Sequence, residues 1–440
     1  MLKSATPQKS LWRIIFALIL FSQFMDINAI NSANAAENQK NQSSVQNNSL
    51  SDIALLRQKA EQGDANAQFS LGILYGNGRD GVAKDQKLAV YWFRKAAEQG
   101  HPPAQANLGM AYFFGLAVEK DVKTALSWFR KSAENGYAEA QYNLGRIYFD
   151  GADVAKDYKI SETFIRKSAL QGNDMAQNLL GFMYANGLGV EKDEKSSVLW
   201  FRKAAEQGNR YSQANLAEAY ENGRGIEKDY KLSAYWYSKS AEQGDADSQK
   251  SLAIMYFQGK GVAKDEKLAA SWFRKAAEQG EVVSQYNLGA MYGEGIGLEQ
   301  DAKAAAYWIR KAAEQGDAKA QYTLAGLYKL GQGVEKDSDA AFFWAGKATD
   351  QGYIPSQHEL DAVYGTGNVH IMDEKGMVEW LRKAVESGDA QAEYLLGEAY
   401  EKGKGIKMDK NEAISWYRKA AAQGEARAIA ALNRLGVKLK

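Results

Sequence analysis

Histidine is the side chain most often used for metal binding and for acid–base catalysis at neutral pH. The chain of 440 residues has three, His101, His358 and His370. No two of them stand three or four positions apart, the spacing that brings two side chains together on one helix face. A metal site needs clustered ligands, and the chain has no cysteine to supply them. The histidines therefore indicate surface residues, and we expect no metal site.

Carboxylate and hydroxyl groups give no catalytic set either. Ten aspartates recur from Asp85 to Asp409 with a period of 36 residues, and each precedes a segment with a helical pattern. A carboxylate at that place caps the backbone N–H groups of the helix. Turns such as Gly295-Ile296-Gly297 lack the Lys-Ser/Thr of a phosphate-binding loop, and no Ser-x-x-Lys motif occurs. We expect no catalytic residue and no cofactor.

The period of these aspartates runs through most of the chain. Glycine marks it with a step of 36 residues after a first step of 37, at positions 63, 100, 136, 172, 208, 244, 280, 316, 352, 388 and 424. Leucine, from Leu71 to Leu396, and tyrosine, from Tyr75 to Tyr400, keep the same period. A period of this length is typical of stacked supersecondary units. It favours a function of surface display over a single reactive pocket.

One repeat predicts two helices, 282–294 and 302–314, because apolar and small residues recur at helical spacing in each. Gly295 and Gly316 end them, and Asp301 caps the second. Tryptophan recurs in the second helix, as in Trp308, and we expect it to supply much of the buried area. Aligned glutamines on the first helix are expected to join repeats by hydrogen bonds: Gln68, Gln105, Gln141, Gln177, Gln213, Gln249, Gln285, Gln321 and Gln357.

The pattern Ala-x-x-x-Leu-Gly-x-x-Tyr, then Gly-x-Gly-Val, Lys-Asp and Trp-Phe-Arg-Lys-Ala-Ala-Glu-Gln-Gly, resembles the Sel1-like repeat family, which is related to tetratricopeptide repeats. The resemblance covers about residues 52–436. It implies an all-α fold, a right-handed α/α solenoid of ten repeats over about 64–424, with the first helix of each repeat on the concave face. It also implies a scaffold that binds proteins. We expect single helices at 52–62 and 426–435 to cover the two ends.

The first 36 residues differ from the repeats. Lys3, Lys9 and Arg13 precede an apolar run over 14–21, and Ala33-Asn34-Ala35 is a candidate cleavage signal. This order is typical of a secretory signal peptide, and the alternative is an uncleaved anchor. Residues 37–51 are polar and indicate a flexible linker. We therefore expect an exported protein, either periplasmic or secreted to the cell surface, with no membrane insertion of the mature chain unless this N-terminal segment is retained.

The charge balance of the chain and the positions that vary between repeats restrict the kinds of partner and the residues that could bind it. The chain has 55 basic and 54 acidic residues, a balance that argues against nucleic acid as a partner. Lysines aligned on the second helices, from Lys95 to Lys419, indicate either a solvated face or a surface for an anionic partner. Positions that vary between repeats are those that can specify a partner. Those expected on the exposed face of the first helices include aromatic and charged residues typical of binding hot spots: Tyr142, Arg146, Phe182, Tyr286, Tyr322 and Tyr394. The alternative is that they pack between neighbouring helices.

These observations predict a non-enzymatic, exported scaffold that binds a partner protein, and a host protein is one candidate for that partner. An adaptor for envelope or peptidoglycan maintenance or for the stress response is the alternative, and a β-lactamase-like hydrolase is a distant one. The ninth unit, 353–388, departs from the pattern at Asp361, His370 and Gly376. It is either a degenerate repeat or a kink or binding site.

Overall fold

The computed structural model consists of α-helices throughout the part of the chain that it describes. The described residues are 42–78, 81–151, 153–351, 353, 378, 381–382, 385, 388 and 390–437. The candidate signal peptide and most of the ninth unit lie outside them. The chain forms two compact units, Met1–Asp229 and Tyr230–Lys440. The expected all-α stack of helix pairs is confirmed, because within each unit every helix packs mainly on the helix before and the helix after it.

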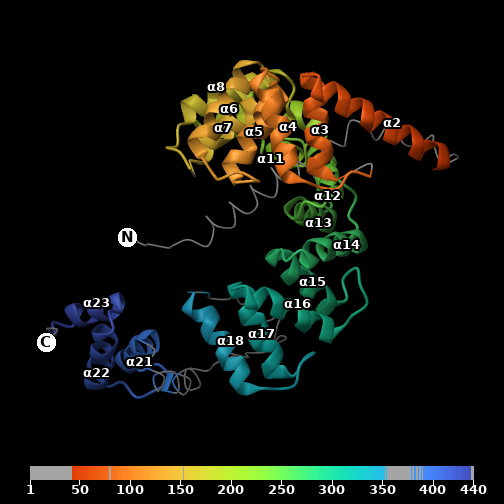
Figure 1. Ribbon diagram of the computed structural model, residues 1–440. Coiled ribbons are helices and arrows are strands. Elements are labelled where there is room, and N and C mark those ends of the chain that lie inside the picture. The colour runs from red at the N-terminus through yellow and green to blue at the C-terminus, as the bar shows by residue number, and fades with distance from the viewer. Residues whose placement is uncertain are drawn as a thin grey trace. The chain divides into compact units, whose positions relative to one another are not determined.

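The first unit begins with α2, Gln42–Glu61, which starts earlier than the helix expected from residue 52 and covers part of the range expected to be a linker. The first helices of its repeats are α3 (Ala65–Asn77), α5 (Pro102–Phe114), α7 (Ala138–Asp150), α9 (Asp174–Asn186) and α11 (Arg210–Asn222). The second helices alternate with them (Figure 1): α4 (Gln86–Glu98), α6 (Val122–Glu134), α8 (Tyr158–Leu170) and α10 (Glu194–Glu206).

The second unit has the same alternation. Its first helices are α13 (Ala246–Gln258), α15 (Val282–Glu294), α17 (Ala318–Leu330) and α21 (Ala390–Lys402). Its second helices are α12 (Tyr230–Glu242), α14 (Glu266–Glu278), α16 (Ala302–Glu314), α18 (Ser338–Asp350) and α22 (Lys410–Ala422), and α23 (Ala426–Arg434) follows them. The predicted bounds of the two helices 282–294 and 302–314 match α15 and α16.

The helix ends explain this close match. Gly295, with φ 70°, ends α15 in the left-handed region that glycine enters without steric cost, and its N–H donates to the Met291 carbonyl. Asp301 then accepts hydrogen bonds from the backbone N–H groups of Lys303, at 2.9 Å, and Ala304, at 3.0 Å. The expected capping role of the repeated aspartates is confirmed here and at Asp85, Asp121, Asp157, Asp193, Asp265, Asp337 and Asp409.

The core differs from the expectation in one respect. In the described second helices the residue after the tryptophan is buried, as in Phe93, Phe129 and Phe273, and rings such as Phe93 and Phe129 pack against the first helix of their repeat. Trp308, which was expected to supply much of the buried area, is only partly buried and packs beside the core cluster that contains Phe273 and Leu288, and most of its equivalents in the described helices are partly buried too. The reason is helix geometry, because one residue step rotates a side chain by about 100° around the axis. The core stripe is centred one position later than the sequence pattern indicated.

Glutamines join successive repeats, as expected. Gln285 donates from Nε2 to the Ala277 carbonyl at 3.1 Å, and its Oε1 accepts from Nε2 of Gln315 at 2.8 Å. Gln141 makes the same pair of bonds in the first unit, with Ala133 and Gln171. Each bond satisfies a buried amide that would otherwise be costly. Within the described residues, none of the helices is long and apolar enough to cross a bilayer.

Candidate functional site

A groove of about 580 Å³ lies over the first helices α13, α15 and α17 of the second unit. Aromatic and aliphatic side chains form most of its walls, and two of the six residues predicted to bind a partner, Tyr286 and Tyr322, are among them. A largely apolar concavity with a few polar groups is what binding sites typically present. The other lining residues are Ile254, Phe257, Gln258, Phe273, Asn287, Gly289, Ala290, Met291, Gly293, Glu294, Ile296, Ala305, Ile309, Lys319, Thr323, Leu327, Gln332 and Tyr353.

Small residues in the middle repeat give the groove its depth. The position of Phe257 in α13 is held by Gly293 in α15, and the position of Ile254 is held by Ala290. The groove is therefore open over α15 where α13 carries large side chains. Gly289 lies below it against α16, because a Cβ atom at Gly289 would stand only 2.6 Å from Cγ1 of Ile309. Close helix packing below and missing side chains above together produce the concavity.

The tyrosines of the groove are held by neighbours from the next repeat. Nζ of Lys319, on α17, lies 5.0 Å from the centre of the Tyr286 ring. The ring of Tyr322 lies 5.8 Å from the ring of Tyr353. Both tyrosines are partly buried, and each presents part of its ring to the groove. Aromatic rings held in this way lose little side-chain entropy on binding, and this favours them as contact residues.

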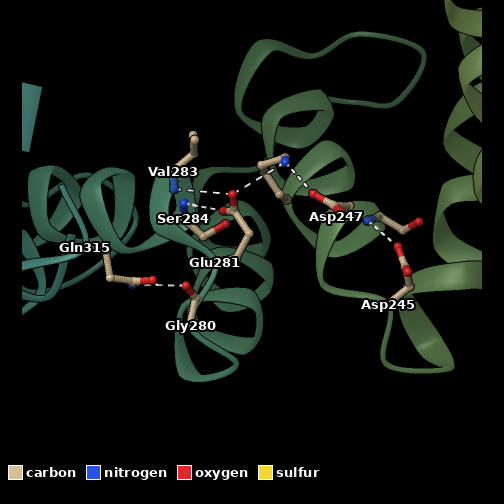
Figure 2. Close-up of polar contacts among 9 residues, drawn as sticks. Asp245, Asp247, Gly280, Glu281, Val283, Ser284 and Gln315 are labelled. Atoms are coloured by element: carbon tan, nitrogen blue, oxygen red, sulfur yellow. Dashed lines mark hydrogen bonds and ion pairs between the residues drawn. The ribbon is translucent and has the colours of Figure 1, made fainter. Parts of the chain in front are cut away.

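Ion pairs fix the repeat interface beside this groove. Lys250, one turn before Ile254 on α13, contacts Asp247 at 2.6 Å and Glu281 at 3.4 Å. Figure 2 shows Glu281 at the start of α15, where it also accepts from the backbone N–H groups of Val283 and Ser284. Partial burial acts to lower the pKa of Lys250, but these two carboxylates raise it above its usual value. The ammonium group therefore stays charged and joins α13 to α15.

The first unit places the predicted residues differently. Tyr142 is buried in a core cluster with Ile165, Leu180 and Met183. Nη1 of Arg146 donates to the Tyr142 hydroxyl at 3.4 Å, and Nε of Arg146 donates to Oδ2 of Asp150 at 2.9 Å. Burial raises the pKa of Tyr142, which outweighs the opposite effect of Arg146. Tyr142 and Arg146 thus make most of their contacts within the stack.

The two remaining predicted residues lie apart from the groove. Phe182 is 42% exposed on α9, and its ring packs edge-on against Phe149 at 6.1 Å. Tyr394 lies on α21, where its ring is 5.6 Å from that of Tyr417 and 4.8 Å from the guanidinium carbon of Arg427. Of the six predicted residues, the structure therefore places only Tyr286 and Tyr322 in the groove, while Tyr142 and Arg146 contact each other in the first unit.

Polar hollows recur elsewhere at one repeat position. They lie between the inter-helix loop and a second-helix arginine, at Arg166 with Tyr184, Arg274 with Tyr292, and Arg310 with Tyr328. In each, Nη2 of the arginine donates to the tyrosine hydroxyl. Because they recur with the repeat, these hollows belong to the way repeats stack. No group of three or more acidic residues and histidines in the described segments could hold a metal ion.

The histidine that the structure describes has a structural role. Nδ1 of His101 accepts from the Ala104 N–H at 3.2 Å and caps α5, and its Nε2 lies 3.1 Å from Oδ1 of Asn66 in the preceding repeat. Partial burial lowers the pKa of His101. His358 and His370 lie outside the described residues. The sequence reasoning missed Ile254, Phe257 and the small residues of α15, and the change of side-chain size between equivalent positions was the signal that could have found them.

The helix pairs, their caps and the glutamine bonds define a class, the α-solenoid built from two-helix repeats. Within that class the chain belongs to the Sel1 repeat family, whose model matches residues 65–101, 102–137, 138–173, 174–209, 210–245, 246–281, 282–317, 318–353, 378–389 and 390–425. Proteins built from these repeats generally mediate protein–protein interactions and are typically non-catalytic. The ninth match, 378–389, is short, in keeping with the divergence seen in the sequence of that unit.

Two solved structures are similar over most of this chain. The protective antigen c5321 of uropathogenic Escherichia coli strains, which displays the same repeat fold, shares 40% sequence identity. The similarity covers 88% of this chain and 84% of that one, with a TM-score of 0.68. A Sel1 repeat protein from Oxalobacter formigenes shares 34% identity over 68% of this chain and 87% of its own, with a TM-score of 0.52. A search of curated proteins gives no match.

Proposed function

We propose that this protein is an exported, non-enzymatic scaffold whose second unit holds a partner protein in the groove over α13, α15 and α17. The observation that carries the proposal is the pairing of Tyr286 and Tyr322 in one apolar concavity. Family membership supports protein binding in general. The groove is the candidate binding site. It lies on the first helices, and the family resemblance implies that these helices form the concave face.

The chemistry of the groove indicates what it binds. Its walls offer aromatic and aliphatic surface, with Lys319 and Glu294 at the edge. Such a site favours an apolar side chain or a short apolar segment of a protein, because desolvating both surfaces is favourable and the edge charges fix the orientation. A small polar metabolite would leave most of these walls without a complementary contact.

Export and a host partner form the second part of the proposal. The basic and apolar N-terminal segment supports export. The similarity to a protein described as a protective antigen supports a location that host molecules reach. An adaptor in the envelope would use the same groove. Whether the partner comes from the host or from the bacterial envelope would distinguish the two roles.

The test is affinity capture with purified protein against envelope extract and host extract in parallel, followed by measurement of the captured partner's affinity. We expect Tyr286→Ala with Tyr322→Ala to weaken that affinity by on the order of tenfold or more, as loss of hot-spot rings does. The melting temperature should fall by only a few degrees, because neither ring is fully buried. Tyr211→Ala, at an exposed tyrosine on α11, is the matched control. Unchanged affinity in the double variant would refute the proposal.

A further inference from the structure

The outward face of the second helices carries large apolar side chains that remain exposed. They occupy one position of the helix, held by Tyr91, Leu199, Tyr235, Tyr307 and Phe343, and each is between 48% and 54% exposed. The residue two positions later is buried in each of these helices, as in Tyr237 and Ile309. Two residues rotate a helix by about 200°, so the exposed position points away from the core in every repeat.

In the second unit three of these residues form what we call the outer stripe, Tyr235, Tyr307 and Phe343. Each ring packs edge-on against the tryptophan that follows it, with centroids 5.0 Å apart for Tyr235 and 5.1 Å for the other two. A lysine one turn later lies near each ring, with Nζ of Lys239 and Lys311 at 5.8 Å from the centroid and Nζ of Lys347 at 5.0 Å. The rings are therefore held on the surface beside a positive charge.

Charge is unevenly distributed between the two faces of the stack. Basic residues outnumber acidic ones on every described second helix except α18, although the whole chain has a net charge of only +1. The lysines Lys239, Lys311 and Lys347 are exposed, and their flexible stems let the ammonium groups move away from the rings. This surface combines exposed apolar rings with exposed lysines. A complementary partner has an apolar interior and anionic groups on its surface.

We propose that the outer stripe docks this protein on the surface of a bilayer that carries anionic headgroups. Tyrosine, tryptophan and phenylalanine side chains settle at the level of the headgroups, and lysines beside them pair with lipid phosphates. An apolar signal combined with a basic one binds a membrane more firmly than either signal alone. In this proposal the contact with the bilayer is peripheral, because it is made by side chains on the surface of the second helices. It leaves the groove, built from the first helices, available for a protein partner.

The observations favour a bilayer over an anionic polymer. Phe343 has no polar atom, and in the first unit Leu199 holds the same position between Lys195 and Lys203. A nucleic acid or an acidic protein would pair with the lysines but would gain little from exposed aliphatic groups, whereas a bilayer provides an apolar interior for them. The combination of apolar side chains and lysines therefore favours a bilayer as the partner of this surface.

The experiment measures co-flotation of the full-length protein with vesicles of phosphatidylcholine alone and with vesicles in which about a third of the lipid is phosphatidylglycerol. We expect preferential binding to the anionic vesicles that weakens with added salt. The variant Tyr235→Ser, Tyr307→Ser, Phe343→Ser copies the serine that the chain itself has at this position, Ser271 in α14. Its partition coefficient should fall by about tenfold or more. Lys239→Gln, Lys311→Gln, Lys347→Gln should reduce it by roughly fivefold for each lysine.

The groove variant Tyr286→Ala, Tyr322→Ala is the control and should bind vesicles like the original protein. Circular dichroism melts establish that each variant is folded. Equal binding to both kinds of vesicle would overturn the proposal. So would unchanged binding of the serine variant, which would reduce the effect to plain charge attraction. Polyglutamate serves as an anionic polymer for comparison. If it bound the original protein, and the serine variant lost affinity for it as much as for the anionic vesicles, a bilayer would be overturned as the partner of the outer stripe.

Discussion

The first helices of the two units present equivalent positions that do different things. In the first unit, Tyr142 is buried and Arg146 bonds both to it and to Asp150, so the surface is closed by its own contacts. In the second unit, Tyr286 holds the same repeat position as Tyr142, but Ala290 and Gly293 stand where Arg146 and Phe149 stand. Removing two large side chains turns a packed tyrosine into the wall of a groove. Equivalent positions in a repeat protein thus acquire function through what their neighbours lack.

The largest expected effect is a difference in stability between variants of the two tyrosines, Tyr142 and Tyr286. Tyr142→Ala should lower the free energy of unfolding by about 3–5 kcal/mol, as truncation of a buried aromatic side chain does. Tyr286→Ala should lower it by clearly less, because the Tyr286 ring is only partly buried. Denaturant titration of both variants measures the difference. Equal losses would mean that the two positions are packed alike and would remove the basis of the comparison.

The glutamine bonds sharpen the comparison by testing what the two units share. Gln141→Ala and Gln285→Ala each remove two inter-helix hydrogen bonds, one from a partner amide and one to a backbone carbonyl. Each variant should lose about 1–3 kcal/mol of stability. Hydrogen exchange should show the loss centred on the altered repeat and its neighbours, because a solenoid is stabilised by nearest-neighbour interfaces. A change spread evenly over the chain would contradict this.

The smallest expected effect is a pH dependence of the stability of α21–α23, the last helices of the second unit. Oε2 of Glu401 accepts from Nη2 of Arg434 at 2.8 Å and from the Tyr417 hydroxyl at 2.6 Å. Partial burial acts to raise the pKa of Glu401, but these bonds lower it. A lowered pKa in the folded state adds stability above the unfolded value, and this stability is lost as the pH falls through the folded value.

Glu401→Gln should therefore flatten the decline in stability of α21–α23 below about pH 4.5. Melting curves at a series of acidic pH values measure it. Gln423→Ala, which removes a neighbouring bond to Glu393 on α21, is a suitable control for loss of a contact that does not involve Glu401. An unchanged acid profile for the Glu401 variant would show that the Arg434 contact does not affect folding.

The sequence predicted the parts of the fold that depend on local rules. Helix ends followed from Asp301 and Gly295, and the glutamine bonds followed from their periodic alignment. Trp308 packs beside the core and is only partly buried, because a pattern defines a stripe only to within one residue of rotation. Tyr142 and Tyr286 could not be told apart, since their burial depends on residues from other repeats. The groove depends on Ala290 and Gly293, which a search for reactive or aromatic residues passes over.

The central claim is that the groove of the second unit, and not the equivalent surface of the first, contacts a partner protein. A photo-crosslinking amino acid placed at position 290 or position 182 tests it directly, because Ala290 and Phe182 hold the same repeat position in the two units. The account predicts a strong crosslink to one partner from position 290, weakened by Tyr322→Ala, and little from position 182. Equal crosslinking from both positions, or a crosslink from position 182 alone, would contradict it.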